Sequence, residues 1–356
     1  MERRKVKAMI LAAGRGQRLD PLTTILPKPL FPVLNKPVLA WILEYLAKFS
    51  VKEIIINLYH LAPQIHEAMK DGSLWGIKLS YSYETQILGT AGGVKKVEEF
   101  LKGGTFILYN GDTLVDLDLT EALAFHRAKG ALATLVVRED KEAPQYGLIR
   151  IGSDGRVIQF LDHSAPIIPE RTYETMFTGI HILEPDILLE IPANQYCGFS
   201  EEVYPNLIRK GYPVYGYLFN GYWIDIGTPE KYFKANKDFL GKTKEAITAI
   251  PNGLGKEIKI FSPVILGDNT TLQDSCSLGP YSIIGDNCSI GKRSKVQGCI
   301  LWSNVTLAHD VRVKNAIIAP GVYLPPGTMI EDRIVIKVPE EQGFLSQPLS
   351  SSPLLS

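Results

Sequence analysis

The sequence predicts an α/β protein in which a Rossmann-like, mostly parallel sheet is followed by a short parallel β-helix of hexapeptide repeats. Over the first two thirds of the chain, short apolar runs rich in β-branched residues alternate with runs of helical spacing, which is typical of a sheet covered on both faces. From about residue 260, aliphatic residues instead recur every six positions. This period fits neither a helical face nor an alternating strand, so it indicates a β-helix.

The elements of the first region follow from these apolar runs and from helix-start signals. Pro37 and the Thr228-Pro229 pair are typical helix N-termini, and Thr120 stands near the start of another helix. We expect strands at residues 6–13, 53–57, 78–83, 105–110, 131–137, 148–151, 157–161, 177–183 and 214–219. We expect helices at residues 37–49, 62–69, 93–100, 119–129 and 229–240.

The repeat region is marked by one aliphatic residue in every six. The repeating positions are Leu272, Leu278, Ile284, Ile290 and Val296, and after a register shift near 299–303 they are Val305, Val311 and Ile317. So few coils need a cap or a partner, which favours a homo-oligomer assembled through the β-helix. We expect a first domain at 1–240, a linker at 241–259, the β-helix at 260–338 and a flexible tail at 339–356.

Bulk composition excludes several classes of function. The 38 basic residues balance 38 acidic ones, so no overall field favours nucleic acid or an anionic membrane. The apolar run at 6–13 is too short for a membrane span and lacks a signal-peptide cleavage site, so we expect a cytoplasmic protein. Its four cysteines, Cys197, Cys276, Cys288 and Cys299, are spaced unlike zinc ligands and are expected to be structural thiols. The last three are expected at equivalent interior positions of the coils.

The segment 11–33, LAAGRGQRLDPLTTILPKPLFPV, carries the strongest functional signal. Gly14 and Gly16 let the backbone approach an anion closely, and Arg18 and Lys28 add positive charge. A Walker loop would need Gly-Lys-Ser/Thr, and the dinucleotide fingerprint would need glycine in place of Leu19. Because the turn follows a predicted strand, we expect a triphosphate site at that end of the sheet.

Further motifs follow this segment in a fixed order. They are Leu88-Gly89-Thr90-Ala91-Gly92-Gly93, Asn110-Gly111-Asp112, Tyr146-Gly147 and Trp223-Ile224-Asp225-Ile226-Gly227-Thr228. With these motifs and the hexapeptide tail, nearly the whole chain resembles the sugar-1-phosphate nucleotidylyltransferases, most closely the GDP-mannose pyrophosphorylase type. The resemblance implies a left-handed β-helix and a direct attack of a sugar-1-phosphate oxygen on the α-phosphorus of a nucleoside triphosphate, releasing pyrophosphate.

The resemblance also implies which residues form the site. Arg18, Lys28 and Asp112 would be catalytic, and Asp112 and Asp225 would bind Mg²⁺, a hard cation that prefers carboxylate oxygens. The expected nucleotide-binding residues are Leu11, Ala12, Ala13, Gly14, Gly16, Arg18, Lys28, Glu84, Gly89, Thr90 and Ala91. The expected sugar-binding residues are Gly147, Glu174, Thr178 and Gly179.

Base and sugar are predicted from single positions. Glu84 can only accept hydrogen bonds, which suits the adjacent N1–H and 2-amino donors of guanine, whereas thymidylyl and uridylyl members commonly carry glutamine there. An exposed charge beside a strand is the alternative. Many relatives carry Glu-Lys-Pro where this chain has Asp162-His163-Ser164, so the contact to the sugar phosphate is unassigned, and His163 is interpreted as a surface residue. We expect GTP and mannose-1-phosphate as substrates.

Three alternatives are weighed against this activity. The first is a glucose-1-phosphate thymidylyl- or uridylyltransferase. The second is a regulatory paralogue that binds nucleotide sugars without turnover, which is disfavoured because Arg18, Lys28, Asp112 and Asp225 are all present. The third is acyl transfer by the β-helix with His309 as base, for which a lone histidine is weak support.

Overall fold

The computed structural model describes residues 6–141, 143, 147–243, 255–338 and 343–350. Its contacts divide the chain into two compact units. The first unit is Met1–Arg15, Pro27–Leu30 and Val38–Ile224, and the second is Gly16–Leu26, Phe31–Pro37 and Asp225–Ser356. The expected linker and tail lie partly outside the described residues, at 244–254, 339–342 and 351–356.

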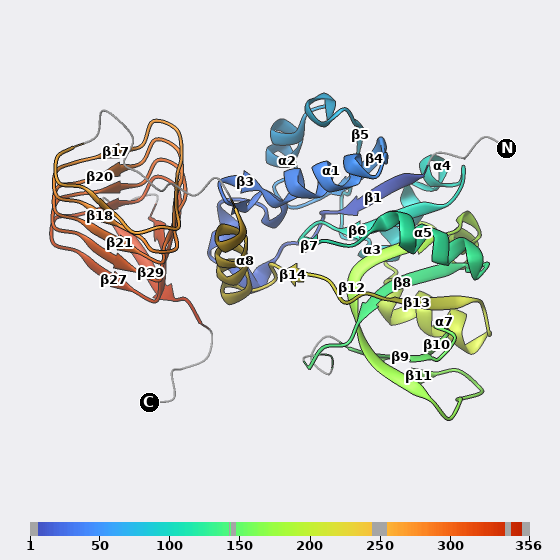
Figure 1. Ribbon diagram of the computed structural model, residues 1–356. Helices are drawn as coiled ribbons and strands as arrows, with labels where there is room; N and C mark the ends of the chain where they lie inside the picture. The colour runs from blue at the N-terminus through green and yellow to red at the C-terminus, as the bar shows by residue number, and fades with distance from the viewer. Residues whose placement is uncertain (1–5, 142, 144–146, 244–254, 339–342, 351–356) are drawn as a thin grey trace. The chain divides into compact units, whose positions relative to one another are not determined.

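The first unit is built on a ten-stranded sheet (Figure 1). One half is parallel, in the order β6-β1-β4-β5, where β1 is Lys7–Leu11, β4 Glu53–Leu58, β5 Lys78–Tyr83 and β6 Phe106–Asn110. The carboxyl ends of these parallel strands lie at one edge of the sheet, and this is the edge where ligands bind in open α/β folds. The glycine turn after β1 lies at this edge.

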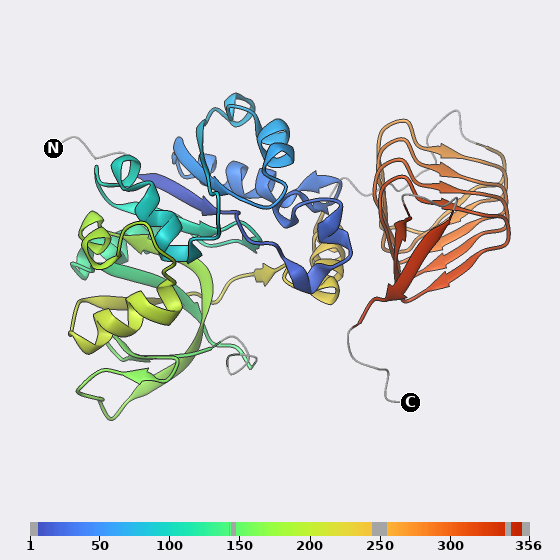
Figure 2. The ribbon, with the colours of Figure 1, turned by 180° about the vertical axis from the view of Figure 1, so that it is seen from behind.

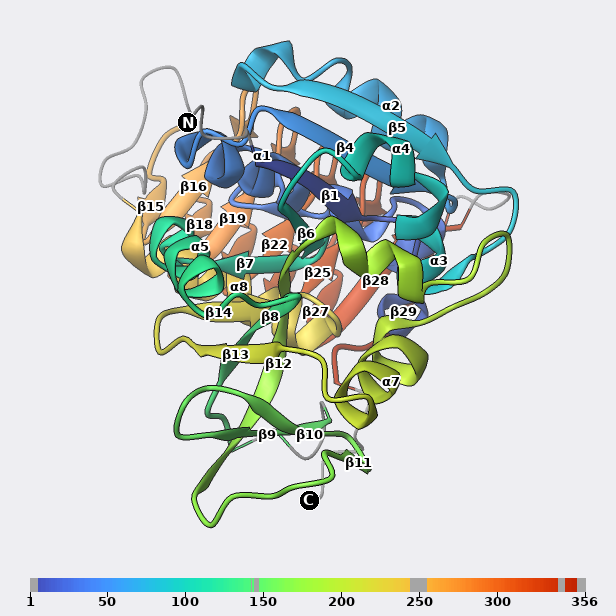
Figure 3. The same ribbon diagram turned by 90° about the vertical axis from the view of Figure 1, so that its right-hand side faces the viewer.

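The other half of the sheet is mostly antiparallel. Its strands are β8 Ala133–Arg138, β9 Leu148–Gly152, β10 Val157–Phe160, β11 His163–Ser164, β12 Thr172–Leu183 and β13 Val214–Leu218. β12 pairs antiparallel with β6, β8 and β9, and only β13 pairs parallel with β8. Figure 3 shows β9, β10 and β11 together, with α7, Tyr204–Arg209, beside them. The sheet is therefore mixed, and its antiparallel half contains the strands expected at 148–151, 157–161 and 177–183.

Helices cover the sheet and pack into its apolar core. They are α1 Val38–Lys48, α2 Ala62–Met69, α3 Gly89–Lys96, α4 Glu98–Leu101, α5 Leu119–Ala128 and α7 Tyr204–Arg209. One core cluster joins strand residues such as Leu108 and Val137 to Val94 on α3, Leu101 on α4 and Leu207 on α7. The short 3₁₀-helices are η1 Gln17–Leu19, η2 Leu22–Thr24, η3 Lys28–Leu30, η4 Ser73–Trp75 and η5 Pro185–Glu190, and η6 Phe199–Val203 is a π-helix.

Two small sheets are separate from the ten-stranded sheet, and the one formed by residues 32–37 belongs to the second unit. β2 Pro32–Val33 pairs antiparallel with β3 Lys36–Pro37, and β7 Thr113–Val115 pairs with β14 Trp223–Asp225. The sequence did not predict these short strands, because strands of two or three residues leave no period to detect.

Helix starts show where local signals succeed and fail. Thr228 caps α8, Pro229–Lys242, as predicted, with its hydroxyl accepting from Lys231 N at 3.3 Å. Thr120 lies near the start of α5, as predicted, and the cap is Asp118, whose carboxylate accepts from Thr120 N at 2.7 Å. The helix expected at 93–100 begins earlier, at Gly89, and is interrupted at Val97.

The second unit contains the β-helix, whose strands stack in layers (Figure 2). One sheet has β15 Lys259–Ile260, β18 Ser277–Leu278, β21 Lys295–Gln297, β24 Arg312–Lys314 and β27 Met329–Glu331. A second has β16 Val264–Leu266, β19 Ser282–Ile284, β22 Ile300–Leu301, β25 Ile317–Ile318, β28 Arg333–Lys337 and β29 Phe344–Pro348. A third has β17 Thr271–Leu272, β20 Ser289–Ile290, β23 Thr306–Leu307 and β26 Tyr323–Leu324.

The predicted repeat positions form the interior of this stack, with one correction. All of the first set, from Leu272 to Val296, lie in the interior cluster, as do Val305 and Val311. Ile317 does not, because its neighbour Ile318 occupies that cluster and adjacent strand residues face opposite sides. Three buried cysteines also lie in the cluster, each directly before a strand, which confirms their equivalent interior positions: Cys276, Cys288 and Cys299.

The outer face of one β-helix sheet is buried within the second unit. Successive coils place five isoleucines in register on this face, all nearly inaccessible: Ile265, Ile283, Ile300, Ile317 and Ile334. Trp302 packs against Phe31 and donates its indole N–H to the Tyr232 hydroxyl of α8 at 2.9 Å. Because α8 packs here, the contacts group it with the second unit, although the sequence prediction ends the first domain at 240.

The last strand, β29, differs from the predicted flexible tail. Phe344–Pro348 pairs antiparallel with β28 and so covers one edge of the final coil. Its Gln347 side chain donates to the carbonyl of Asp20 at 2.8 Å. Among the helices that the structure describes, none is both long and apolar enough to cross a membrane.

Candidate active site

The predicted nucleotide turn begins with Leu11, the last residue of β1, and continues with Ala12, Ala13, Gly14 and Gly16. Its two alanines are buried and both glycines are accessible. Gly16 has a φ of 66°, in the left-handed region where a side chain is disfavoured. The turn η1 then buries Leu19 and leaves Arg18 exposed. The exposed Arg18 therefore lies directly after the turn, as the sequence predicts.

Lys28 and Asp112 meet within the first unit. Lys28, only 9% exposed, donates from Nζ to the Asp112 Oδ2. Asp112 follows β6, which lies next to β1, and Gly111 N donates to the Leu11 carbonyl at 2.9 Å. A Cβ on Gly111 would lie 2.7 Å from that carbonyl oxygen, so only glycine fits. The glycine turn, an ammonium and a carboxylate are thus adjacent at one edge of the sheet.

Tyr109 is buried on β6, three residues before Asp112. Burial, and after it the charge of Asp112, raises the pKa of Tyr109 well above its usual range. The phenol therefore stays neutral and donates to the Thr113 carbonyl at 3.2 Å. This contact supports the backbone on the far side of Asp112 without adding charge.

The predicted motif 88–93 forms the start of α3. The N–H groups of Ala91 and Gly92 both donate to the Cys197 carbonyl at 3.0 Å. The Thr90 hydroxyl accepts from Phe199 N at 2.9 Å. The Thr90 hydroxyl and the Ala91 N–H, both in residues predicted to bind the nucleotide, therefore form hydrogen bonds within the protein. A Cβ on Gly89, whose φ is 75°, would collide with the Cys197 carbonyl.

Glu84 is buried rather than exposed beside its strand, with 7% of its surface accessible. Its Oε1 accepts from the Asn57 side chain at 2.7 Å, and its Oε2 accepts from Leu88 N at 3.1 Å. Asn57 itself was not predicted as a site residue. The available signal was a single polar residue at the end of the buried apolar run 54–58.

Asp225 belongs to the second unit, at the end of β14. It is 8% exposed, and its Oδ1 accepts from Gly227 N at 2.7 Å. Its Oδ2 accepts from Lys231 Nζ at 3.2 Å. A Cβ on Gly227 would lie 3.1 Å from the Arg18 guanidinium, so glycine leaves room for that cation. Lys231, which the sequence analysis missed, thus joins Arg18 and Asp225 around the start of α8.

The two predicted sugar-site glycines have backbone conformations that favour glycine. Gly147 has a φ of 97° and Gly179 a φ of 87°. A Cβ on Gly179 would lie 2.6 Å from Asn110 Nδ2, so this glycine packs against the motif that carries Asp112. Tyr146 lies outside the described residues.

The predicted polar sugar contacts have protein partners. Arg150 donates to Glu174 Oε1 from Nη2 at 2.7 Å, on an exposed part of β12. The Thr178 hydroxyl is buried and donates to the Val136 carbonyl at 2.7 Å. Glu174 is therefore accessible to a ligand, whereas the Thr178 hydroxyl is used in a hydrogen bond within the sheet. His163 is exposed on β11, consistent with a surface histidine.

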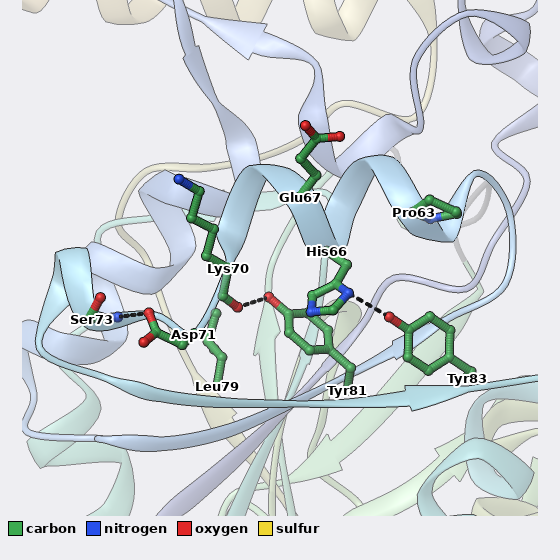
Figure 4. Close-up of a pocket in the computed structure, with 9 residues that line it drawn as sticks. All are labelled: Pro63, His66, Glu67, Lys70, Asp71, Ser73, Leu79, Tyr81 and Tyr83. Atoms are coloured by element: carbon green, nitrogen blue, oxygen red, sulfur yellow. Dashed lines mark hydrogen bonds between the residues drawn. The ribbon is translucent and has the colours of Figure 1, made fainter.

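A separate pocket of about 950 Å³ lies between α2 and β5 (Figure 4). In it His66 Nδ1 and the Tyr83 hydroxyl are 2.8 Å apart, and the Tyr81 hydroxyl donates to the Lys70 carbonyl at 2.5 Å. None of the residues predicted for the nucleotide or sugar lines this pocket. It is not part of the site described above.

The carboxylates fit the chemistry of Mg²⁺. Across the ranges that the structure describes, no group of three or more His, Cys, Asp or Glu side chains could hold a metal ion. Mg²⁺ typically binds one or two carboxylates and takes its other ligands from water and substrate phosphates. Asp112 and Asp225 are such carboxylates, each with a lysine beside it, Lys28 and Lys231 respectively.

A glycine turn at the end of β1, followed by an arginine and bordered by a paired lysine and carboxylate, defines an enzyme of the nucleotidyl-transfer class. Comparison with known proteins agrees: residues 7–242 match the nucleotidyl transferase family, and residues 251–339 match the LbH (left-handed β-helix) domain of EIF2B subunit epsilon. The chain belongs to the sugar-1-phosphate nucleotidylyltransferases. Its fold class, an α/β sheet domain followed by a left-handed β-helix, is thereby confirmed.

Individual relatives differ in the activity that they are named for. The chain is 32% identical to a UTP–glucose-1-phosphate uridylyltransferase of Synechocystis, covering 93% of this chain and 87% of that relative. It is 27% identical to a mannose-1-phosphate guanylyltransferase of Mycobacterium tuberculosis, over 93% and 84% of the two chains. The solved structure of HddC from Yersinia pseudotuberculosis, 26% identical, covers 66% of this chain and 99% of HddC with a TM-score of 0.56. HddC has also been solved complexed with GMP-PN.

Proposed function

We propose that this enzyme transfers GMP from GTP to mannose-1-phosphate, forming GDP-mannose and pyrophosphate. The observation that carries nucleotidyl transfer is the contact of Lys28 with Asp112 beside the glycine turn. Support for guanine and mannose comes from relatives named mannose-1-phosphate guanylyltransferase in Mycobacterium tuberculosis and mannose-1-phosphate guanyltransferase in Yarrowia lipolytica, the latter 32% identical over 88% of this chain.

In this proposal the chain's own residues bind and neutralise phosphate. The backbone N–H groups of the turn orient the triphosphate, and the Arg18 guanidinium binds the departing pyrophosphate through paired hydrogen bonds. The Lys28 ammonium reduces the repulsion between the sugar phosphate and the α-phosphate as they approach. Asp112 and Asp225 would hold Mg²⁺, which supplies positive charge to the phosphate oxygens when bound. A compartment rich in nucleoside triphosphates is needed, so the cytoplasm stays the proposed location.

A second candidate is UTP with glucose-1-phosphate. The Synechocystis relative, named for this activity, is 32% identical over 93% of the chain. Both candidates use the same triphosphate turn, so they differ only in the base and hexose that the site accepts.

The test is pyrophosphate release from a matrix of NTPs and hexose-1-phosphates with Mg²⁺. We expect the highest kcat/KM for GTP with mannose-1-phosphate, and loss of activity in Asp112→Asn and on addition of EDTA. A preference for UTP with glucose-1-phosphate would replace the first candidate by the second. Absence of pyrophosphate release from every pair would overturn nucleotidyl transfer itself.

Self-association through the β-helix is proposed as well. Within the described residues, β26 and β27 are the last strands of their sheets, and only the sheet of β28 gains a covering strand, β29. Unpaired strand edges favour pairing with another chain. Light scattering after size-exclusion chromatography would report a single-chain mass if this proposal is wrong.

A further inference from the structure

A chain of three hydrogen bonds joins the glycine turn to the start of α3. Asn57 lies on β4 opposite Leu11 of β1, and only 3% of its surface is accessible. Its Oδ1 accepts from Ala12 N at 2.8 Å, and its Nδ2 donates to Glu84 Oε1 at 2.7 Å. The other carboxylate oxygen of Glu84 accepts from Leu88 N at 3.1 Å. Two segments distant in sequence are thereby linked through two buried side chains.

The two groups at the ends of this series of hydrogen bonds determine which side chains fit between them. Both ends are backbone N–H groups, of Ala12 and Leu88, and both can only donate. Residue 57 must then accept on one side, which leaves its amide nitrogen to donate on the other. Residue 84 faces a donor on each side, so both of its oxygens must accept. A carboxylate meets this demand, whereas an amide would point its own N–H at a donor.

Close packing holds the pair in place. A Cβ on Gly93 of α3 would lie 3.0 Å from both Asn57 Nδ2 and Glu84 Oε1. Glycine at this position lets α3 press directly onto the hydrogen bond between them. A buried polar group that loses its partner in such a site is destabilised, because no water replaces the lost hydrogen bond.

We propose that Asn57 and Glu84 are positioning residues that fix the spacing between the glycine turn and the 88–93 segment. This rests on the proposed function and on the prediction that both segments bind the nucleoside triphosphate. The acidic character of residue 84 is then set by the two internal donors. It is not set by the base, and guanine recognition belongs to other groups.

An exchange of the amide and the carboxylate tests this directly. In Glu84→Gln one donor faces another, and in Asn57→Asp two carboxylates face each other. In the double variant, which combines Asn57→Asp with Glu84→Gln, the carboxylate now at position 57 accepts from Ala12 N and from the amide now at position 84. The side-chain carbonyl of that amide accepts from Leu88 N, so every donor again has an acceptor.

The expected effects are distinct for the three variants. We expect each single change to raise the KM and Kd for NTP about tenfold, from one lost buried partner. The double variant should return to within about threefold of the parent, because the chain of hydrogen bonds is restored with its direction reversed between the two side chains.

Three measurements separate the outcomes: NTP binding by equilibrium titration, the KM and kcat for pyrophosphate release, and the ratio of GTP to UTP use. The exposed Glu67→Gln on α2 is the matched control and should leave all three unchanged. A double variant as impaired as Glu84→Gln, or a GTP-to-UTP ratio that follows residue 84, would overturn the positioning role. A parent protein that binds no NTP would instead overturn the proposed function, and the nucleotide role of the pair with it.

Discussion

Both units of this protein contain parallel strands, but they use them differently. In the first unit, the parallel strands β1, β4, β5 and β6 have five or six residues each and are followed by unlike loops, and the pairs Lys28–Asp112 and Asn57–Glu84 form in this region. In the β-helix, strands of two to five residues stack in register around an interior that is nearly the same from coil to coil. The repeated coils form a scaffold whose period can be detected in the sequence. The candidate site instead depends on side-chain contacts that each occur once in the protein.

The sharpest way to test this contrast is to remove one of the unique contacts. Lys28→Ala should lower kcat by about 10²- to 10³-fold, or ~3–4 kcal/mol, because one charge that stabilises the transition state is lost. The KM for NTP should rise less. Lys259→Ala on β15, an exposed lysine of the β-helix, is the control and should retain full activity. A larger effect on KM than on kcat would make Lys28 a binding residue only.

The repeated region should respond alike at equivalent positions. Leu278→Ala and Leu301→Ala each remove a fully buried interior side chain, and each should lower the free energy of unfolding by about 2–5 kcal/mol. Urea denaturation followed by circular dichroism measures both, with the exposed Thr271→Ala as control. Strongly unequal losses would show that the coils are not equivalent.

The two units should also differ in how their stability depends on pH. Burial lowers the pKa of His181 in the first unit to about 3, against 6.5 in the unfolded chain. Below pH 6.5 the unfolded state therefore binds a proton that the native state does not, and stability falls as pH drops towards 3. The slope contributed is at most about 1.4 kcal/mol per pH unit.

The His181→Gln variant isolates this contribution. Its free energy of unfolding, measured between pH 7 and 4, should fall less steeply than that of the parent. Thr271→Ala, at an exposed position of the β-helix that carries no titratable group, should keep the parental slope. Equal slopes in all three proteins would refute the assignment to His181.

The smallest effect is expected on the outer face of the β-helix. Lys314 donates to Glu331 of the next coil at 2.6 Å, but both side chains are about half exposed. Exposed pairs of this kind contribute little, because water and salt screen them. Lys314→Ala should leave the thermal midpoint unchanged within error, and a clear decrease would mean that this face is covered.

Much of the site could be predicted from sequence because its signals are local. The glycine turn, Lys28 and Asp112 lie in short motifs, and the structure brings Lys28 and Asp112 into contact. Glu84 was singled out as well, but its partners could not be predicted, since Asn57 and Ala12 are 45 residues apart and the pairing of β1 with β4 joins them. Ile317 was misplaced because a shift of one residue reverses the face of a strand.

By itself the sequence determined the fold class, the six-residue period of the β-helix and the position of the glycine turn, since each depends on residues close together in the chain. Only the tertiary structure decided that α8 packs with the β-helix, that residues 344–348 form a strand, and that Glu84 faces two internal donors. The physical reason is that strand register and helix packing choose partners across long stretches of chain. A single pattern of hydrophobic residues is compatible with several such choices.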